Sequence, residues 1–81
     1  MAELSRAEVC LGAQNWFERH GRAADPVAGR VYECVCEHGD QQLEDCVRRL
    51  ADSDEPLTQE QVQAAWERLV GMAEHFRQGY L

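Results

Sequence analysis

Hydrophobic residues recur every three or four positions along four stretches of the chain, which is the spacing of an amphipathic helix. The first helix is predicted from about Arg6 to His20. Ser5 and Glu8 form a capping-box pattern at its start, and Gly21 is a natural helix stop. Its predicted inner face contains Val9, Ala13, Trp16, Phe17 and His20, with Cys10 at the edge.

The second predicted helix starts at Asp25-Pro26, because Asp is a favourable N-cap and Pro loses no hydrogen bond in the first turn. Gly39 ends this helix. Tyr32 and Cys36 are four residues apart and therefore share a separate face. The predicted inner face contains Val27, Val31, Cys34, Val35 and His38.

The third predicted helix runs from about Gln41 to Ala51, with Asp40 as its cap. The acidic segment that follows contains Pro56, which disfavours a helical residue before it, so we expect a loop there. The apolar side of this helix consists of Leu43, Cys46, Val47 and Leu50.

The fourth predicted helix, from about Gln59 to Gln78, is the longest. Thr58 and Gln61 form a second capping box at its start. Gly71 falls on its polar face, where glycine costs about 1 kcal/mol relative to alanine, and close approach of a neighbour is the one reason that we can offer for it. The apolar face contains Val62, Ala65, Trp66, Leu69, Met72, Ala73, Phe76 and Tyr80.

No segment alternates hydrophobic and polar residues for long enough to form a strand. We therefore expect a single all-α domain over residues 1–81, a compact bundle of four helices with short loops and the last helix as the main wall of the core. A domain of this size is only about 5 kcal/mol more stable than its unfolded state unless a partner or another subunit helps.

Negative charge is concentrated in the middle of the chain. Residues 33–60 contain nine acidic residues and two arginines, which equals the whole net charge of −7, whereas residues 1–32 and 61–81 are each balanced. Such a region should repel nucleic acid and attract a basic protein, because opposed potentials speed association and orient the partners. The simpler interpretation is a solvated face that keeps the protein soluble.

We predict that this middle region binds a basic protein or a nucleic-acid-binding complex. Carboxylates along two short helices and a loop can imitate nucleic-acid phosphates, and an aromatic ring among them would provide an interface anchor. A nucleophile with a base and an orienting third group cannot be assigned, so we expect no enzymatic activity and no cofactor. The predicted partner-binding residues are Tyr32, Glu33, Glu37, Glu44, Asp45, Asp52, Asp54 and Glu55.

The four cysteines are the other candidate chemistry. The chain has neither a signal-peptide pattern nor the roughly 20 apolar residues of a membrane span, so we expect a cytoplasmic protein with reduced thiols. Cys34, His38 and Cys46 are candidate zinc ligands, although the paired C-x-x-C spacing of many zinc sites is missing. The alternative is that both cysteines fill the core and no metal is bound.

Two further alternatives concern the whole domain. Arg48 and Arg49 lie on the predicted third helix, as in a helix-turn-helix regulator, but acidic neighbours surround them and oppose direct contact with DNA. Small domains commonly gain buried area by forming homodimers, and several apolar residues are left over once one core is built.

In overall profile the chain resembles the small acidic inhibitor proteins of phages and mobile elements, such as anti-CRISPR proteins, and the immunity proteins that block nuclease toxins. The shared features are short length, acidity between Asp40 and Glu60, and the absence of catalytic motifs. All eight basic residues are arginine, which is typical of a GC-rich bacterial genome. The resemblance implies a protein that occludes a basic, nucleic-acid-handling partner, and it transfers no functional residue.

Overall fold

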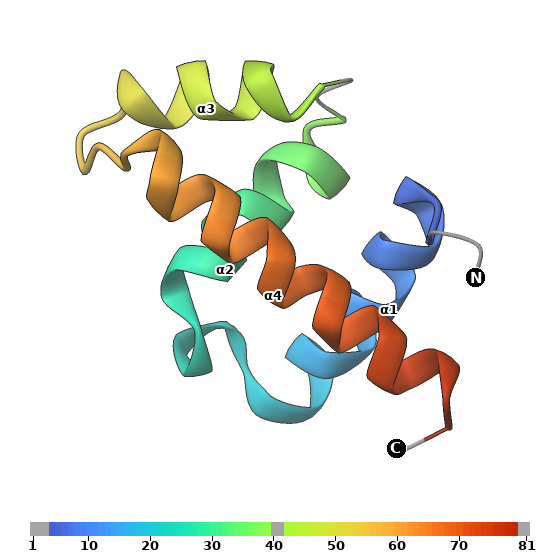
Figure 1. The fold of residues 1–81 in the computed structure, drawn as a ribbon. Coiled ribbons are helices and arrows are strands. Elements are labelled where there is room, and N and C mark those ends of the chain that lie inside the picture. Colours follow the sequence, from blue (N-terminus) through green and yellow to red (C-terminus); the bar gives the residue numbers. More distant parts are fainter. Residues whose placement is uncertain (1–3, 40–41, 80–81) are drawn as a thin grey trace.

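The computed structural model describes residues 4–39 and 42–79, and these residues form the predicted all-α fold. A 3₁₀ turn, Arg22–Ala24, precedes the second helix, and a π-helical segment, Glu33–Glu37, continues it. The α-helices of the described residues are α1 Arg6–His20, α2 Pro26–Tyr32, α3 Leu43–Ala51 and α4 Gln59–Arg77 (Figure 1).

The predicted side chains form the helix starts. Ser5 Oγ accepts a hydrogen bond from the Glu8 amide at 3.2 Å, and Glu8 Oε1 accepts one from the Ser5 amide at 3.1 Å. Thr58 and Gln61 form the same reciprocal pair at the start of α4, at 3.1 and 2.9 Å. The Asp25 carboxylate caps α2, and Pro26 occupies its first turn. Both capping boxes and the Asp-Pro start are therefore confirmed.

The third helix starts slightly later than predicted. Leu43 is its first residue, and Gln42 occupies the N-cap position without a side-chain hydrogen bond. The predicted cap, Asp40, and the predicted first residue, Gln41, lie outside the described residues. The predicted end at Ala51 is confirmed, and Cys46 and Leu50 are buried as expected.

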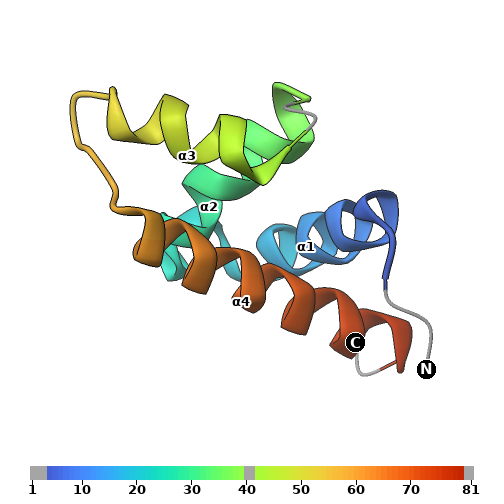
Figure 2. The same ribbon diagram turned by 45° about the horizontal axis from the view of Figure 1, so that its top comes forward.

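Helix α4 crosses the whole molecule and contacts each of the other helices (Figures 1 and 2). Its first half lies beside α2 and α3, and its second half lies beside α1. The two helices α1 and α4 approach each other closely at Gly12, where a Cβ atom would overlap the backbone of Ala73. The predicted role of α4 as the main wall of the core is confirmed.

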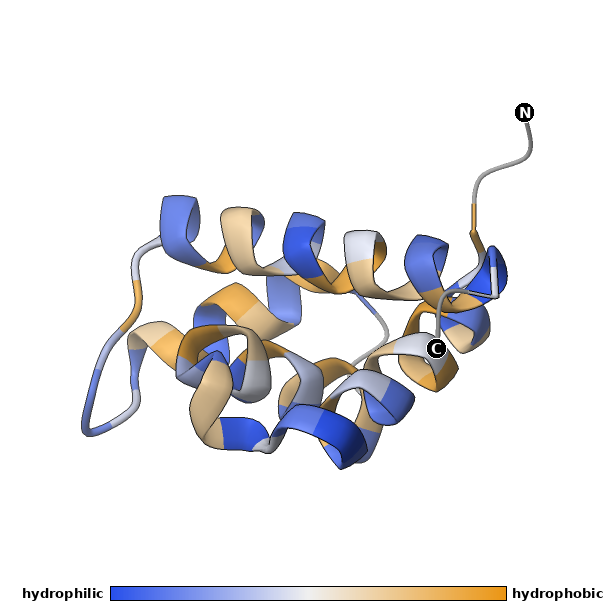
Figure 3. Ribbon diagram, turned by 90° about the horizontal axis from the view of Figure 1, so that it is seen from below, coloured by the Kyte–Doolittle hydropathy of each residue, from blue (hydrophilic) through white to orange (hydrophobic). Residues whose placement is uncertain are grey.

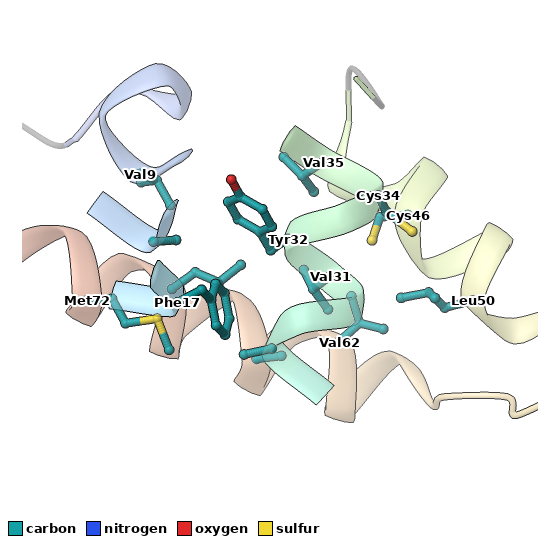
Figure 4. Close-up of a cluster of buried hydrophobic side chains, with 14 of the residues drawn as sticks. Val9, Phe17, Val31, Tyr32, Cys34, Val35, Cys46, Leu50, Val62 and Met72 are labelled. Carbon is teal, nitrogen blue, oxygen red and sulfur yellow. The ribbon is translucent and has the colours of Figure 1, made fainter. Parts of the chain in front are cut away.

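Hydrophobic positions gather between the helices, and hydrophilic positions colour the outer surfaces (Figure 3). Phe17 of α1, Val31 of α2 and Val62 of α4 meet in this core (Figure 4). The buried residues of α4 are all from its predicted apolar face: Val62, Ala65, Leu69, Met72 and Ala73. Within the described residues, no helix is both long and apolar enough to cross a membrane.

Tyr32 is part of the core and not of the surface, which corrects its predicted role as an exposed anchor. Only 7% of it is accessible. Its ring packs edge-on against Phe17, with centroids 5.4 Å apart, and the Arg22 guanidinium lies 4.8 Å from its centroid. Helix α2 is covered by α1 on this side as well as by α4, so its buried surface is wider than one stripe. Burial also raises the pKa of the Tyr32 hydroxyl.

The π-helical segment that follows α2 changes the direction in which the side chains at its end point. The His38 amide donates to the Glu33 carbonyl at 2.8 Å, a five-residue spacing that widens the turn. Cys34 and Val35 are buried as predicted, but His38 is exposed and its Nε2 lies 3.7 Å from Glu33 Oε1. The prediction that His38 belongs to the inner face is therefore wrong.

A disulfide joins Cys10 of α1 to Cys36 of the π-helical segment, with Cα atoms 5.7 Å apart. This bond corrects the expectation that all four cysteines are reduced. Cys34 and Cys46 are buried thiols that point into the space between the π-helical segment and α3 (Figure 4). The disulfide bridges residues 26 positions apart, so the spacing of the cysteines in the sequence does not reveal it.

Candidate functional site

The predicted carboxylates separate into two groups with different surroundings. One group lies on α3 and on the loop that connects it to α4, at the end of the molecule away from α1 (Figures 1 and 2). Its side chains are all exposed. We call this group the acidic end, and it consists of Glu44, Asp45, Asp52, Asp54 and Glu55.

Arg30 of α2 holds the loop of the acidic end through the loop backbone. Its Nη1 donates to the Glu55 carbonyl oxygen at 2.6 Å, and its Nη2 donates to Ser53 Oγ at 2.7 Å. The Leu57 amide closes the loop by donating to the Leu50 carbonyl at 3.2 Å, and Leu57 is buried. The loop is thus fixed without using its carboxylates.

The carboxylates of the acidic end form no ion pair within residues 4–39 and 42–79. Within this part of the chain, no ion pair neutralises these carboxylates. Arg48 and Arg49 lie exposed on the same helix and offset part of the charge locally. The acidic end still carries an excess of negative charge over a short distance.

The second group of predicted carboxylates lies on the π-helical segment and is engaged within the protein. Glu37 Oε1 lies 3.0 Å from Arg22 Nη2, and Glu33 lies beside His38. Both carboxylates remain about half exposed. Glu37 also faces a hollow formed with Phe17 and Tyr32, so it belongs to the α1 side of the molecule and not to the acidic end.

The proposed zinc ligands are not brought together. Cys34 and Cys46 are buried, whereas His38 is on the surface, and Cys36 and Cys10 are joined in the disulfide. Within residues 4–39 and 42–79, no three His, Cys, Asp or Glu side chains lie close enough together to hold a metal ion. The geometry therefore gives the zinc alternative no support.

A second candidate site lies between α1 and the C-terminal half of α4. It is a cleft of about 270 Å³, and its lining combines aromatic side chains with one arginine. We call it the α1–α4 cleft, and its principal lining residues are Trp16, Arg19, His20, Gly71, His75 and Phe76. Sequence reasoning missed this cleft, because its walls come from residues more than fifty positions apart. The one signal in the sequence was the glycine on the polar face of α4.

A bidentate ion pair joins the start of α2 to α4. Arg68 donates from Nε to Asp25 Oδ2 at 2.7 Å and from Nη2 to Oδ1 at 3.1 Å. These hydrogen bonds lower the pKa of the Asp25 carboxyl and raise the pKa of Arg68. The pair positions helices and leaves the acidic end unaffected.

Comparisons with known proteins give no family assignment. No protein-family model matches the chain, and neither a curated protein nor a solved structure is significantly similar to it.

Proposed function

We propose that this protein is a non-enzymatic binding module whose acidic end docks on a basic surface of a nucleic-acid-handling protein and occludes it. The observation that carries this proposal is the state of the five carboxylates: all are exposed, and none forms an ion pair within the described residues. The resemblance in length and acidity suggests a more specific form of this function, that of an inhibitor of the anti-CRISPR or immunity type.

The ordered loop supports this proposal. Arg30 holds the backbone at Ser53 and Glu55, so Asp54 is presented from a fixed turn and not from a flexible tail. A preorganised surface loses less conformational freedom on binding, and charge complementarity then sets the orientation of the partner. Tyr32 is buried and therefore cannot serve as an aromatic anchor of the interface. The proposed interface thus depends more on charge than the sequence suggested.

The test is capture of nucleic-acid-binding proteins from a nuclease-treated bacterial lysate, followed by assay of whether the captured protein still binds DNA or RNA. A variant with Asp52→Arg, Asp54→Arg and Glu55→Arg should fold, because Arg30 holds this loop through the backbone and through Ser53 Oγ. We expect it to lose capture, and we expect wild-type capture to be released by high salt.

The matched control reverses charge elsewhere. Glu67 and Glu74 are exposed on α4, and the variant Glu67→Arg with Glu74→Arg should retain capture. The proposal is wrong if reversing the loop carboxylates leaves capture and occlusion unchanged at low salt.

The expected cytoplasmic location stays a prediction. Disulfides are rare in the reducing cytosol of mesophiles, so the Cys10–Cys36 bond weighs against it. A partner that handles nucleic acid outside the cytosol, such as a secreted nuclease, would meet the protein with this bond intact.

A further inference from the structure

The α1–α4 cleft combines a stacking surface with hydrogen-bond donors. Trp16 and His20 line one wall, with ring centroids 4.4 Å apart and planes inclined by 35°, and Phe76 lies on the opposite wall. Trp16 and Phe76 are only partly buried, so ring surface remains accessible inside the cleft. Such walls favour a flat ring that packs against them.

The cleft also contains a cation with no partner of its own. Arg19 is exposed, and within the described part of the chain it forms neither a hydrogen bond nor an ion pair through its guanidinium group. Its side chain carries a fixed positive charge with donors arranged to bind a carboxylate or a phosphate. His75 lies on the facing wall.

Gly71 lines the cleft on the α4 side and contributes no side chain to it. It is exposed in the interior of a helix, where glycine is unfavourable relative to alanine. A Cβ atom at this position would meet nothing within 4 Å, so the fold itself does not require glycine there. Gly71 lines the cleft, so the absence of a side chain at this position leaves the cleft open on the α4 side.

We propose that the α1–α4 cleft binds a small planar anion, an aromatic or heteroaromatic ring that carries one phosphate or carboxylate. The ring packs against Trp16 and Phe76, and the anion is held by Arg19. The cleft volume of about 270 Å³ is slightly below the usual range for ligand sites, so it suits one small molecule of this kind. A long polyanion is disfavoured because the protein carries a net charge of −7.

The test uses adenosine monophosphate and benzoate as the two anionic probes, with adenosine and inorganic phosphate as the ring alone and the anion alone. The chain has two tryptophans, so a Trp66→Phe background leaves Trp16 as the only fluorophore of its kind. We expect at least one anionic probe to change Trp16 fluorescence saturably, with a Kd of about 1 mM or below. Adenosine and phosphate should each bind at least about tenfold more weakly.

Two variants in the same background separate a specific site from a general effect. Gly71→Leu narrows the cleft with a residue of good helix propensity, and Arg19→Gln removes the anion contact. Each should weaken the anionic probe at least about tenfold, while the control Arg48→Gln on α3 leaves binding unchanged. Thermal unfolding checks that each variant is folded. Absence of saturable binding by both anionic probes, or equal binding by wild type and Gly71→Leu, would overturn the proposal.

Discussion

At the scale of single residues, Gly12 and Gly71 lie in helix interiors for different reasons. A side chain at Gly12 would overlap the Ala73 backbone, so the contact between α1 and α4 requires glycine. A side chain at Gly71 would meet open space. Sequence reasoning could place both glycines in helices, but only the packing of two distant segments distinguishes a structural glycine from one that leaves a surface open.

This difference gives opposite expectations for the same substitution. Gly71→Ala should raise the free energy of unfolding by up to about 1 kcal/mol, because alanine favours the helix. Gly12→Ala should lower it by about 1–3 kcal/mol despite that preference, because α1 and α4 must move apart. Urea unfolding of the two variants provides the measurement. Equal stabilisation by both substitutions would contradict the close helix contact.

Asp25 provides a pH-dependent link between α2 and α4. Arg68 lowers the folded-state pKa of Asp25, whereas the unfolded value is about 3.9. The stabilisation is therefore fully present above the unfolded pKa and is lost as the pH falls through the lower, folded-state pKa. Asp25→Asn still caps α2, so it should lower the free energy of unfolding at neutral pH by no more than about 1 kcal/mol, given that Arg68 is half exposed.

Urea unfolding of wild type and Asp25→Asn over a series of pH values checks this expectation. The two stabilities should converge in acid. Arg68→Gln provides the matched control, since it removes the same ion pair from the other side. A stability difference that stays constant down to low pH would show that the Asp25 charge is not the cause.

At the scale of elements, the starts of α1, α2 and α4 were predictable because the deciding contacts are local, whereas α3 starts later than predicted. Ser5 with Glu8 and Thr58 with Gln61 are three residues apart, and their hydrogen bonds need no tertiary structure. The π-helical segment was not predictable from the same pattern. The segment places His38 on the surface while Cys36 bonds to Cys10, and helical periodicity does not predict either position.

The loop between α3 and α4 depends on one arginine from a different element. Arg30→Gln should release the backbone at Ser53 and Glu55, because the donors to both are lost. We expect amide exchange at Leu57, whose N–H donates to Leu50, to accelerate by about tenfold or more. Hydrogen-exchange mass spectrometry or NMR provides the measurement.

The control for this loop is Arg48→Gln, which removes the same charge from α3. It should leave the exchange at Leu57 unchanged. If Arg30→Gln also leaves it unchanged, the loop is held by Leu57 burial alone. Partner capture should weaken in Arg30→Gln although every carboxylate of the acidic end is retained, since the proposed interface needs the ordered loop.

At the scale of the whole molecule, the charge pattern of the sequence predicted an acidic region but not how its carboxylates are distributed in space. Glu44 and Asp54 remain on one exposed end, whereas Glu37 turns toward Arg22 and Tyr32 enters the core. Linear charge counts cannot detect such pairing. The α1–α4 cleft was invisible for the same reason, because its walls belong to the two ends of the chain.

The Cys10–Cys36 bond has the largest expected effect on global stability. It joins residues 26 positions apart, and the loss of loop-closure entropy in the unfolded chain corresponds to about 3–4 kcal/mol. The double variant Cys10→Ser with Cys36→Ser should lose about that amount, measured by urea unfolding without reductant. For a domain of this size, such a loss is a large fraction of the total stability.

Thiol counting under denaturing conditions tests the bond itself. Protein purified without reductant should show two reactive thiols per chain, from Cys34 and Cys46, and four after reduction. Four thiols before reduction would contradict the disulfide. Adding reductant to wild type should reproduce the stability of the double variant, because both remove the same cross-link. The stability of this fold, and with it the presentation of the acidic end, would then depend on the redox state of the compartment.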